Sequence, residues 1–112
     1  MRRDLLYLAD ICSAADGVRT FLEGVSRETF LEDKVRQSAV LQKLIVIGEA
    51  ASRISPELKT RHPGLPWNEM VGLRNIAVHA YFDINWGIVW ATAVSDVPQV
   101  RESVHRVLES AD

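Results

Sequence analysis

The sequence is poor in cysteine and has no basic excess. The first shortage excludes two kinds of site, and the second limits how the chain could bind nucleic acid. Cys12 is the single cysteine, so the chain cannot form an intramolecular disulfide or a cysteine-based zinc cluster. The three histidines, at 62, 79 and 105, lack metal-ligand spacing, and no glycine-rich phosphate loop is present. We therefore expect neither a metal centre nor a cofactor. With a formal net charge of -2, any nucleic-acid binding would have to depend on local charge.

Long apolar runs are also missing. The most apolar stretch, LIVIGEAA at 44–51, is interrupted by Glu49 and is far shorter than the roughly 20 residues that cross a bilayer. The opening MRRDLLYLAD is too short and too charged for a signal peptide. We expect a cytoplasmic protein without a membrane partner, and 112 residues predict one domain, 1–112.

Apolar residues recur at helical spacing through nearly the whole chain. A stripe over 5–22 predicts the first helix, and Gly24 closes it. Thr29 followed by Glu32 has the pattern of a capping box and predicts the start of a second helix. That helix should end at about Ile54, because a Ser-Pro pair follows it.

The second half of the chain continues the helical pattern. Ser55-Pro56 predicts one short helical turn, and a third helix is expected over 67–80. Asp83 is the expected N-cap of a fourth helix, which Pro98 kinks or restarts on its way to the C-terminus. The predicted fold class is all-α, an antiparallel bundle of four main helices with a short extra helical turn.

The middle of the second predicted helix suggests a second copy of the chain. VLQKLIVIGEAA at 40–51 is apolar on more than one face, so one face meets the core and another face remains for a partner. Gly48, Ala50 and Ala51 are small enough to let a further helix approach closely. These residues favour a homodimer.

LRNIAVHAYF, at 73–82, places three polar side chains among apolar residues. Arg74 and His79 are five positions apart, roughly 140° of rotation on an ideal helix, so they do not share a face. Asn75 and His79 do share one. The reach of the arginine, a loosened helix before Tyr81 or a second protomer across a two-fold axis could each bring Arg74 and His79 together.

The trio has a structural and a chemical interpretation. In the structural one, His79 is a helix-end histidine and Tyr81 a partly buried aromatic residue, which is the commoner case for an isolated trio. In the chemical one, the trio cleaves RNA without a metal ion. Histidine titrates in the range needed for proton transfer, and arginine offers a permanent cation to the phosphate.

Glu49 is a carboxylate in an apolar setting, and we expect it to pair with Arg53 or Arg74. It could also support Arg74 by holding the guanidinium in its working orientation. A modest group of basic residues follows Glu49 in the sequence: Arg53, Lys59, Arg61 and His62. We interpret this group as part of a solvated loop, and guidance of RNA toward the site is the alternative.

At these residues the sequence resembles a known family. RNIAVHAY matches the R-x-x-x-x-H-x-Y signature of HepT-like proteins, a branch of the HEPN (higher eukaryote and prokaryote nucleotide-binding) superfamily. IGEAASRIS at 47–55, HPGLPWNEMVGLRN at 62–75 and the downstream Trp90 resemble the pattern of that branch in the same order. The resemblance therefore covers essentially the whole chain.

The resemblance implies the toxin ribonuclease of a toxin–antitoxin pair, an all-helical homodimer that cuts RNA without metal at a cleft between protomers. It implies that Arg74 stabilises phosphate, His79 transfers protons and Asn75 orients the pocket. The implied partner is a minimal nucleotidyltransferase antitoxin, which attaches AMP to Tyr81 and blocks the site. A larger hetero-oligomer with the antitoxin stays open. The alternatives are a non-catalytic nucleotide- or partner-binding module and a purely structural helical dimer.

Overall fold

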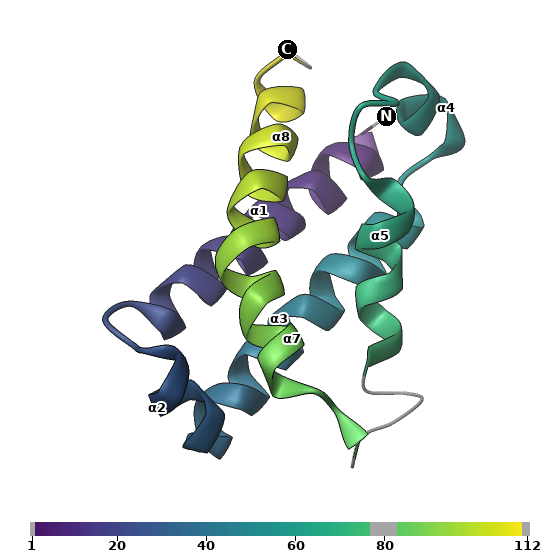
Figure 1. The fold of residues 1–112 in the computed structure, drawn as a ribbon. Helices are drawn as coiled ribbons and strands as arrows, with labels where there is room; N and C mark the ends of the chain where they lie inside the picture. Colours follow the sequence, from purple (N-terminus) through teal and green to yellow (C-terminus); the bar gives the residue numbers. More distant parts are fainter. Residues whose placement is uncertain (1, 77–82, 111–112) are drawn as a thin grey trace.

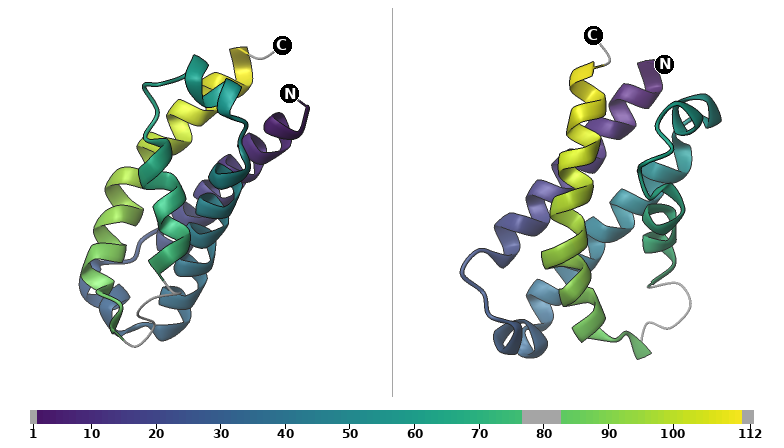
Figure 2. Two further views of the ribbon diagram at one scale, coloured as in Figure 1. Left: turned by 90° about the vertical axis from the view of Figure 1, so that its right-hand side faces the viewer. Right: turned by 45° about the horizontal axis from the view of Figure 1, so that its top comes forward.

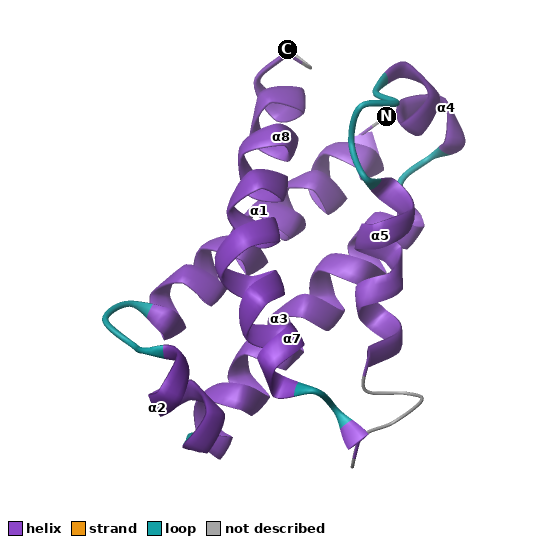
Figure 3. Ribbon diagram, in the orientation of Figure 1, coloured by secondary structure: helices purple, strands orange, loops and turns teal. Residues whose placement is uncertain are grey.

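The computed structural model describes residues 2–76 and 83–110, and every regular element in that part of the chain is helical. The long helices are α1 (Arg2–Leu22), α3 (Lys34–Arg53) and α8 (Val97–Ser110). The short helices are α2 (Arg27–Glu32), α4 (Pro56–Arg61), α5 (Trp67–Gly72) and α7 (Trp86–Ala91). A 3₁₀ turn, η1 (Leu73–Asn75), follows α5, and a π-helical turn, η3 (Thr92–Asp96), joins α7 to α8. Figure 3 shows the described chain as helices joined by loops. The prediction of an all-α fold is confirmed for the described residues.

The helices pack around α1 and α3. Helix α1 lies against α3 along one side and against α8 along another, and α5 and η1 lie along α3 (Figure 1). Helix α2 contacts both α3 and α7 at the end of the bundle opposite the two chain termini (Figure 2). Within the described residues, no helix is long and apolar enough to cross a membrane.

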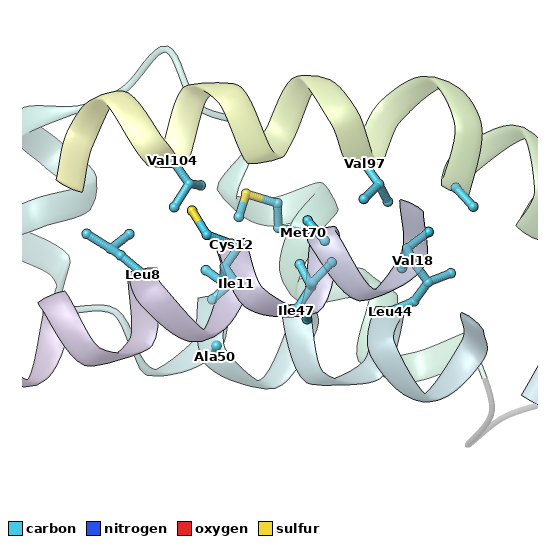
Figure 4. Packing of buried hydrophobic residues seen from close by; sticks show 14 of the residues in the cluster. Leu8, Ile11, Cys12, Val18, Leu44, Ile47, Ala50, Met70, Val97 and Val104 are labelled. Carbon is cyan, nitrogen blue, oxygen red and sulfur yellow. The ribbon is translucent and has the colours of Figure 1, made fainter. Parts of the chain in front are cut away.

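The core fills the space between α1, α3 and α8, and α5 closes it with Met70 (Figure 4). Its centre consists of side chains that are essentially inaccessible to water: Leu8, Ile11, Leu44, Ile47 and Val104. Burying a side chain of this size stabilises a fold by about 1.5–3 kcal/mol. The helical stripes of the sequence thus become the faces that hold α1, α3 and α8 together.

The second predicted helix is in fact two helices. Ser26, and not Thr29, is the N-cap of α2, since the Ser26 hydroxyl accepts a hydrogen bond from Thr29 N at 3.1 Å. Asp33 ends α2 and caps α3, and its carboxylate accepts from Arg36 N at 3.0 Å. The predicted start at Thr29 is wrong because a competing cap lies three residues earlier. The predicted end is confirmed, with Ile54 as the C-cap of α3.

The predicted cap of the fourth helix is also corrected. Asn85 caps α7 in place of Asp83, because the Asn85 carboxamide oxygen accepts from Ile88 N at 3.1 Å. Helix α8 begins directly after the π-helical turn η3, and Pro98 is its second residue. A proline has no amide hydrogen to continue the helical ladder. The helical backbone continues through this point, and the change from π-helix to α-helix just before Pro98 is the irregularity that the sequence predicted as a kink or a restart.

The small residues of α3 face their own chain, which corrects their expected role in a dimer. Ala50 and Ala51 are 5% and 0% exposed and belong to the hydrophobic core. Gly48 faces η1 of the same chain. These three residues are small because neighbouring elements of one molecule approach α3 closely, so they say nothing about a second copy.

Asp4 is a buried carboxylate that ties the start of α1 to α4. Its two oxygens accept hydrogen bonds from Ser55 N at 2.9 Å and from the Ser55 hydroxyl at 2.6 Å. The Ser55 hydroxyl in turn accepts from Leu58 N and caps α4. Burial, the largest single influence, raises the pKa of Asp4. The two bonds from Ser55 and nearby positive charges, that of Arg61 among them, together outweigh burial and hold this pKa below its usual value.

The lowered pKa of Asp4 predicts how stability depends on pH. The bonds stabilise the fold fully above the unfolded-state pKa of about 3.9, and this contribution is lost as the pH falls through the lower folded-state pKa. We expect Asp4→Asn to reduce the free energy of unfolding by about 1.5–3 kcal/mol at neutral pH, and to reduce its fall in acid. Urea unfolding over a pH series measures both effects. Asp10→Asn, an exposed change on the same helix, is the control, and an equal loss in both variants would contradict the assignment.

Candidate functional site

Arg74 lies in η1, at the point where α5 gives way to a tighter turn. A 3₁₀ turn has about 3.0 residues per turn in place of 3.6, so the faces of an ideal α-helix do not carry across Arg74. Asn75 is the last residue of the same turn and is exposed. The departure from α-helical geometry thus includes the arginine itself. His79 and Tyr81 lie outside the described residues.

The backbone of Arg74 packs directly on α3 at Gly48. A Cβ atom on Gly48 would lie 2.5 Å from Arg74 N and 3.1 Å from Arg74 Cα. Packed protein atoms do not approach so closely, so every residue with a side chain would push the two segments apart. Gly48 therefore sets the depth at which η1 lies on α3. The sequence showed that Gly48 permits close approach, but not that the approaching segment carries Arg74.

Glu49, the next residue of α3, carries the charge that faces Arg74. Glu49 Oε1 lies 3.7 Å from Arg74 Nη1, and Glu49 Oε2 lies 3.9 Å from Arg53 Nη2. The prediction that Glu49 pairs with Arg53 or Arg74 is confirmed, and the structure shows both pairs. The side chains of Glu49 and Arg74 are 48% and 40% exposed. Exposed pairs of this kind contribute about 0.2–1 kcal/mol each, so they orient the guanidinium without immobilising it.

The start of α5 is anchored by Trp67. This residue is 7% exposed, and its indole Nε1 donates a hydrogen bond to His62 O at 2.9 Å. The bond ties α5 to the loop that precedes it, while Met70, one turn further on, is buried in the core. Helix α5 is therefore fixed at its start and at its centre, and it delivers η1 to the surface of α3.

The described residues hold no group of three or more His, Cys, Asp or Glu side chains that could bind a metal ion. The two ion pairs join three charged groups, those of Arg74, Arg53 and Glu49. Two permanently charged guanidinium groups and one carboxylate give this trio a positive surplus. Such a surplus attracts an anion, and the planar guanidinium matches the oxygens of a phosphate or a carboxylate.

Fold and site together define a class of protein: a small all-helical domain with a half-exposed arginine where two helical segments join. The family follows from comparison with known proteins. The chain belongs to the HepT-like family, described as "Ribonuclease HepT-like", whose model matches residues 11–107. The resemblance seen in the motifs is thereby confirmed over nearly the whole chain.

Individual relatives bear ribonuclease names. The chain is 36% identical to "Putative RNase MJ1380" of Methanocaldococcus jannaschii, an alignment that covers 95% of this chain and 98% of the relative. It is 38% identical to "Probable ribonuclease HepT" of Thermococcus cleftensis, over 85% of this chain and 86% of the relative. "Putative RNase TTE0752" of Caldanaerobacter subterraneus is 31% identical, over 92% of both chains. No solved structure matches the chain at a significant level.

The contact at Gly48 makes a prediction about stability. We expect Gly48→Ala to lower the free energy of unfolding by about 1–3 kcal/mol, because the added methyl group meets the backbone of Arg74. Gly72→Ala is the matched control, since its Cβ would meet nothing within 4 Å and Gly72 has helical backbone angles. That change should be neutral or stabilising. Urea unfolding of both variants checks the prediction, and equal stability of the two would refute the close contact.

Proposed function

We propose that this protein is the toxin of a toxin–antitoxin pair and acts as a metal-independent RNA endonuclease. The observation that carries the proposal is the match of residues 11–107 to the HepT-like ribonuclease family, together with the R-x-x-x-x-H-x-Y signature at Arg74, His79 and Tyr81. The exposure and positive surplus around Arg74 support it, because an RNA phosphate can reach this guanidinium.

In the proposed reaction the ribose 2′-oxygen attacks the neighbouring phosphorus. His79 accepts the proton of the 2′-hydroxyl, a cyclic phosphate forms, and the bond from phosphorus to the 5′-oxygen breaks. The protonated histidine then returns a proton to the leaving 5′-oxygen. Arg74 stabilises the extra negative charge that the phosphorane carries between these steps. Both partners of the reaction are already in the RNA, so the protein supplies only proton transfer and charge.

Two further residues have supporting roles in this proposal. Asn75 orients the pocket from the end of η1, next to Arg74. Glu49 holds the Arg74 guanidinium through the ion pair at 3.7 Å. Because that pair is weak and exposed, it favours one direction of the arginine side chain without preventing contact with a phosphate.

We further propose that the working form is a homodimer with the motif at the interface. A two-fold axis beside the motif would place two copies of Arg74 and His79 in one cleft and supply both cations and proton-transfer groups from two chains. The 40% exposure of the Arg74 side chain in the single chain is compatible with this arrangement.

The proposed off-switch is the attachment of AMP to Tyr81 by a minimal nucleotidyltransferase antitoxin. The AMP group brings a negatively charged phosphodiester into the sequence neighbourhood of Arg74. It would fill the site and compete for the cation that RNA needs. Modification of the Tyr81 hydroxyl would then block the space that RNA needs and cancel the attraction between Arg74 and an RNA phosphate.

Cleavage in the presence of a chelator tests the catalytic proposal. We expect purified, unmodified protein to cut cellular RNA, and Arg74→Ala and His79→Ala each to lower the rate by about 100-fold or more. Arg106→Ala, a change of an exposed arginine on α8, should leave the rate unchanged. Cleavage that persists in His79→Ala, or that is absent from the wild type, would favour a non-catalytic nucleotide- or partner-binding module.

Co-expression with a minimal nucleotidyltransferase of the proposed kind tests the switch. Mass spectrometry should find AMP on Tyr81 and none on Tyr7, the other tyrosine of the chain. Tyr7→Phe should still be silenced by the partner, whereas Tyr81→Phe should escape. Equal RNA cleavage before and after modification would refute the switch and leave the catalytic proposal standing.

A further inference from the structure

One carboxylate on α3 is shared by two arginines that come from different elements. Glu49 lies within 4 Å of Arg53 on its own helix and of Arg74 on η1, through separate oxygens. The carboxylate neutralises only one of the two guanidinium charges. Arg53 has the more exposed side chain of the two arginines, at 61% against 40%. Elsewhere on the surface, Arg106 has a comparable pair with Glu102 four residues earlier.

We propose that Arg53 is a second phosphate-binding residue of the site and contacts the RNA backbone beside the phosphate that Arg74 holds. In the absence of RNA, Glu49 occupies the anion position between the two arginines. This inference rests on the proposed ribonuclease function, because Arg53 would bind the same RNA strand that the site cleaves.

The spacing of the two arginines is set by the fold. Glu49 and Arg53 are four residues apart on α3 and therefore lie on one face of that helix. Arg74 reaches the same carboxylate from η1, whose backbone is packed against Gly48. Each guanidinium lies within 4 Å of a separate oxygen of the same carboxylate, so the two cations are close enough together to contact neighbouring phosphates of one RNA strand.

Glu49 is held weakly enough for a phosphate to replace it. Its distances to the two guanidinium groups, 3.7 and 3.9 Å, exceed the roughly 2.7–2.9 Å of a charge-assisted hydrogen bond. A phosphate oxygen can approach either arginine more closely than Glu49 does and can use both prongs of the guanidinium fork. The chain has a net charge of -2, so a local pair of cations matters more here than in a basic protein.

The test measures binding separately from cleavage. The probe is a fluorescent 2′-O-methyl RNA strand, which lacks the attacking hydroxyl and cannot be cut, and its anisotropy is followed over a salt series. We expect Arg53→Ala to weaken binding by about fivefold and to reduce the slope of log affinity against log salt by about 1. Arg106→Ala, with the matched pair on α8, should change neither quantity. With cleavable RNA, Arg53→Ala should raise KM and leave kcat nearly unchanged.

Glu49→Gln separates direct contact from an indirect effect through the carboxylate. Removing the competing charge should tighten binding by about two- to threefold, and Arg53→Ala should still weaken binding in that background. If Arg53→Ala has no effect in the Glu49→Gln protein, Arg53 acts only through Glu49 and the inference is wrong. If Arg74→Ala weakens binding but Arg53→Ala behaves like Arg106→Ala, the inference also fails and the ribonuclease proposal stands. A wild-type protein that neither binds nor cuts RNA overturns both.

Discussion

The contact between Gly48 and the backbone of Arg74 is the constraint on which the described part of the site depends. It joins two backbones directly, with the closest approach to a Gly48 Cβ position only 2.5 Å. A contact between side chains can adjust through rotamers, but a contact between backbones cannot. Helix α3 is itself held by α1 and the core, so Arg74 takes its position from the most buried part of the molecule.

This constraint explains how weak electrostatic interactions can still organise the site. The ion pairs of Glu49 are long and exposed, and they would be poor at defining the position of a mobile arginine. Here the backbone has already placed Arg74, and the carboxylate only selects a direction for its side chain. A buried, tightly bonded pair would hold the guanidinium more firmly, but it would resist exchange of the carboxylate for a phosphate. Firm backbone packing at Gly48 together with a weak ion pair to Glu49 suits the proposed phosphate site, because a phosphate that binds there must be able to replace the carboxylate and dissociate again.

The parts of the fold that sequence predicted are those with an unambiguous local signal, such as the end of α1 and the starts of α4 and α5. The helix caps were predictable only where a single candidate existed. Ser26 competes with Thr29, and Asn85 competes with Asp83. Asparagine and aspartate cap equally well, and serine and threonine are both common caps, with serine the better of the two. Gly48 shows a deeper limit, because a small residue permits close approach without saying whether the approaching segment belongs to the same chain. The pairing of Glu49 was predictable, since it has an arginine four residues away on its own helix.

The motif itself cannot be interpreted on an ideal helix. Its arginine belongs to a 3₁₀ turn, where each residue advances by about 120° in place of 100°, so the faces of an ideal α-helix do not carry across Arg74. On α3, which packs against this turn, ideal helical spacing does apply, because Glu49 and Arg53 lie in a regular α-helix. The proposed tasks divide along the same line. Arg53 on the regular helix would contribute to RNA binding alone, whereas Arg74, on the turn that the Gly48 contact fixes, would contribute to both binding and cleavage.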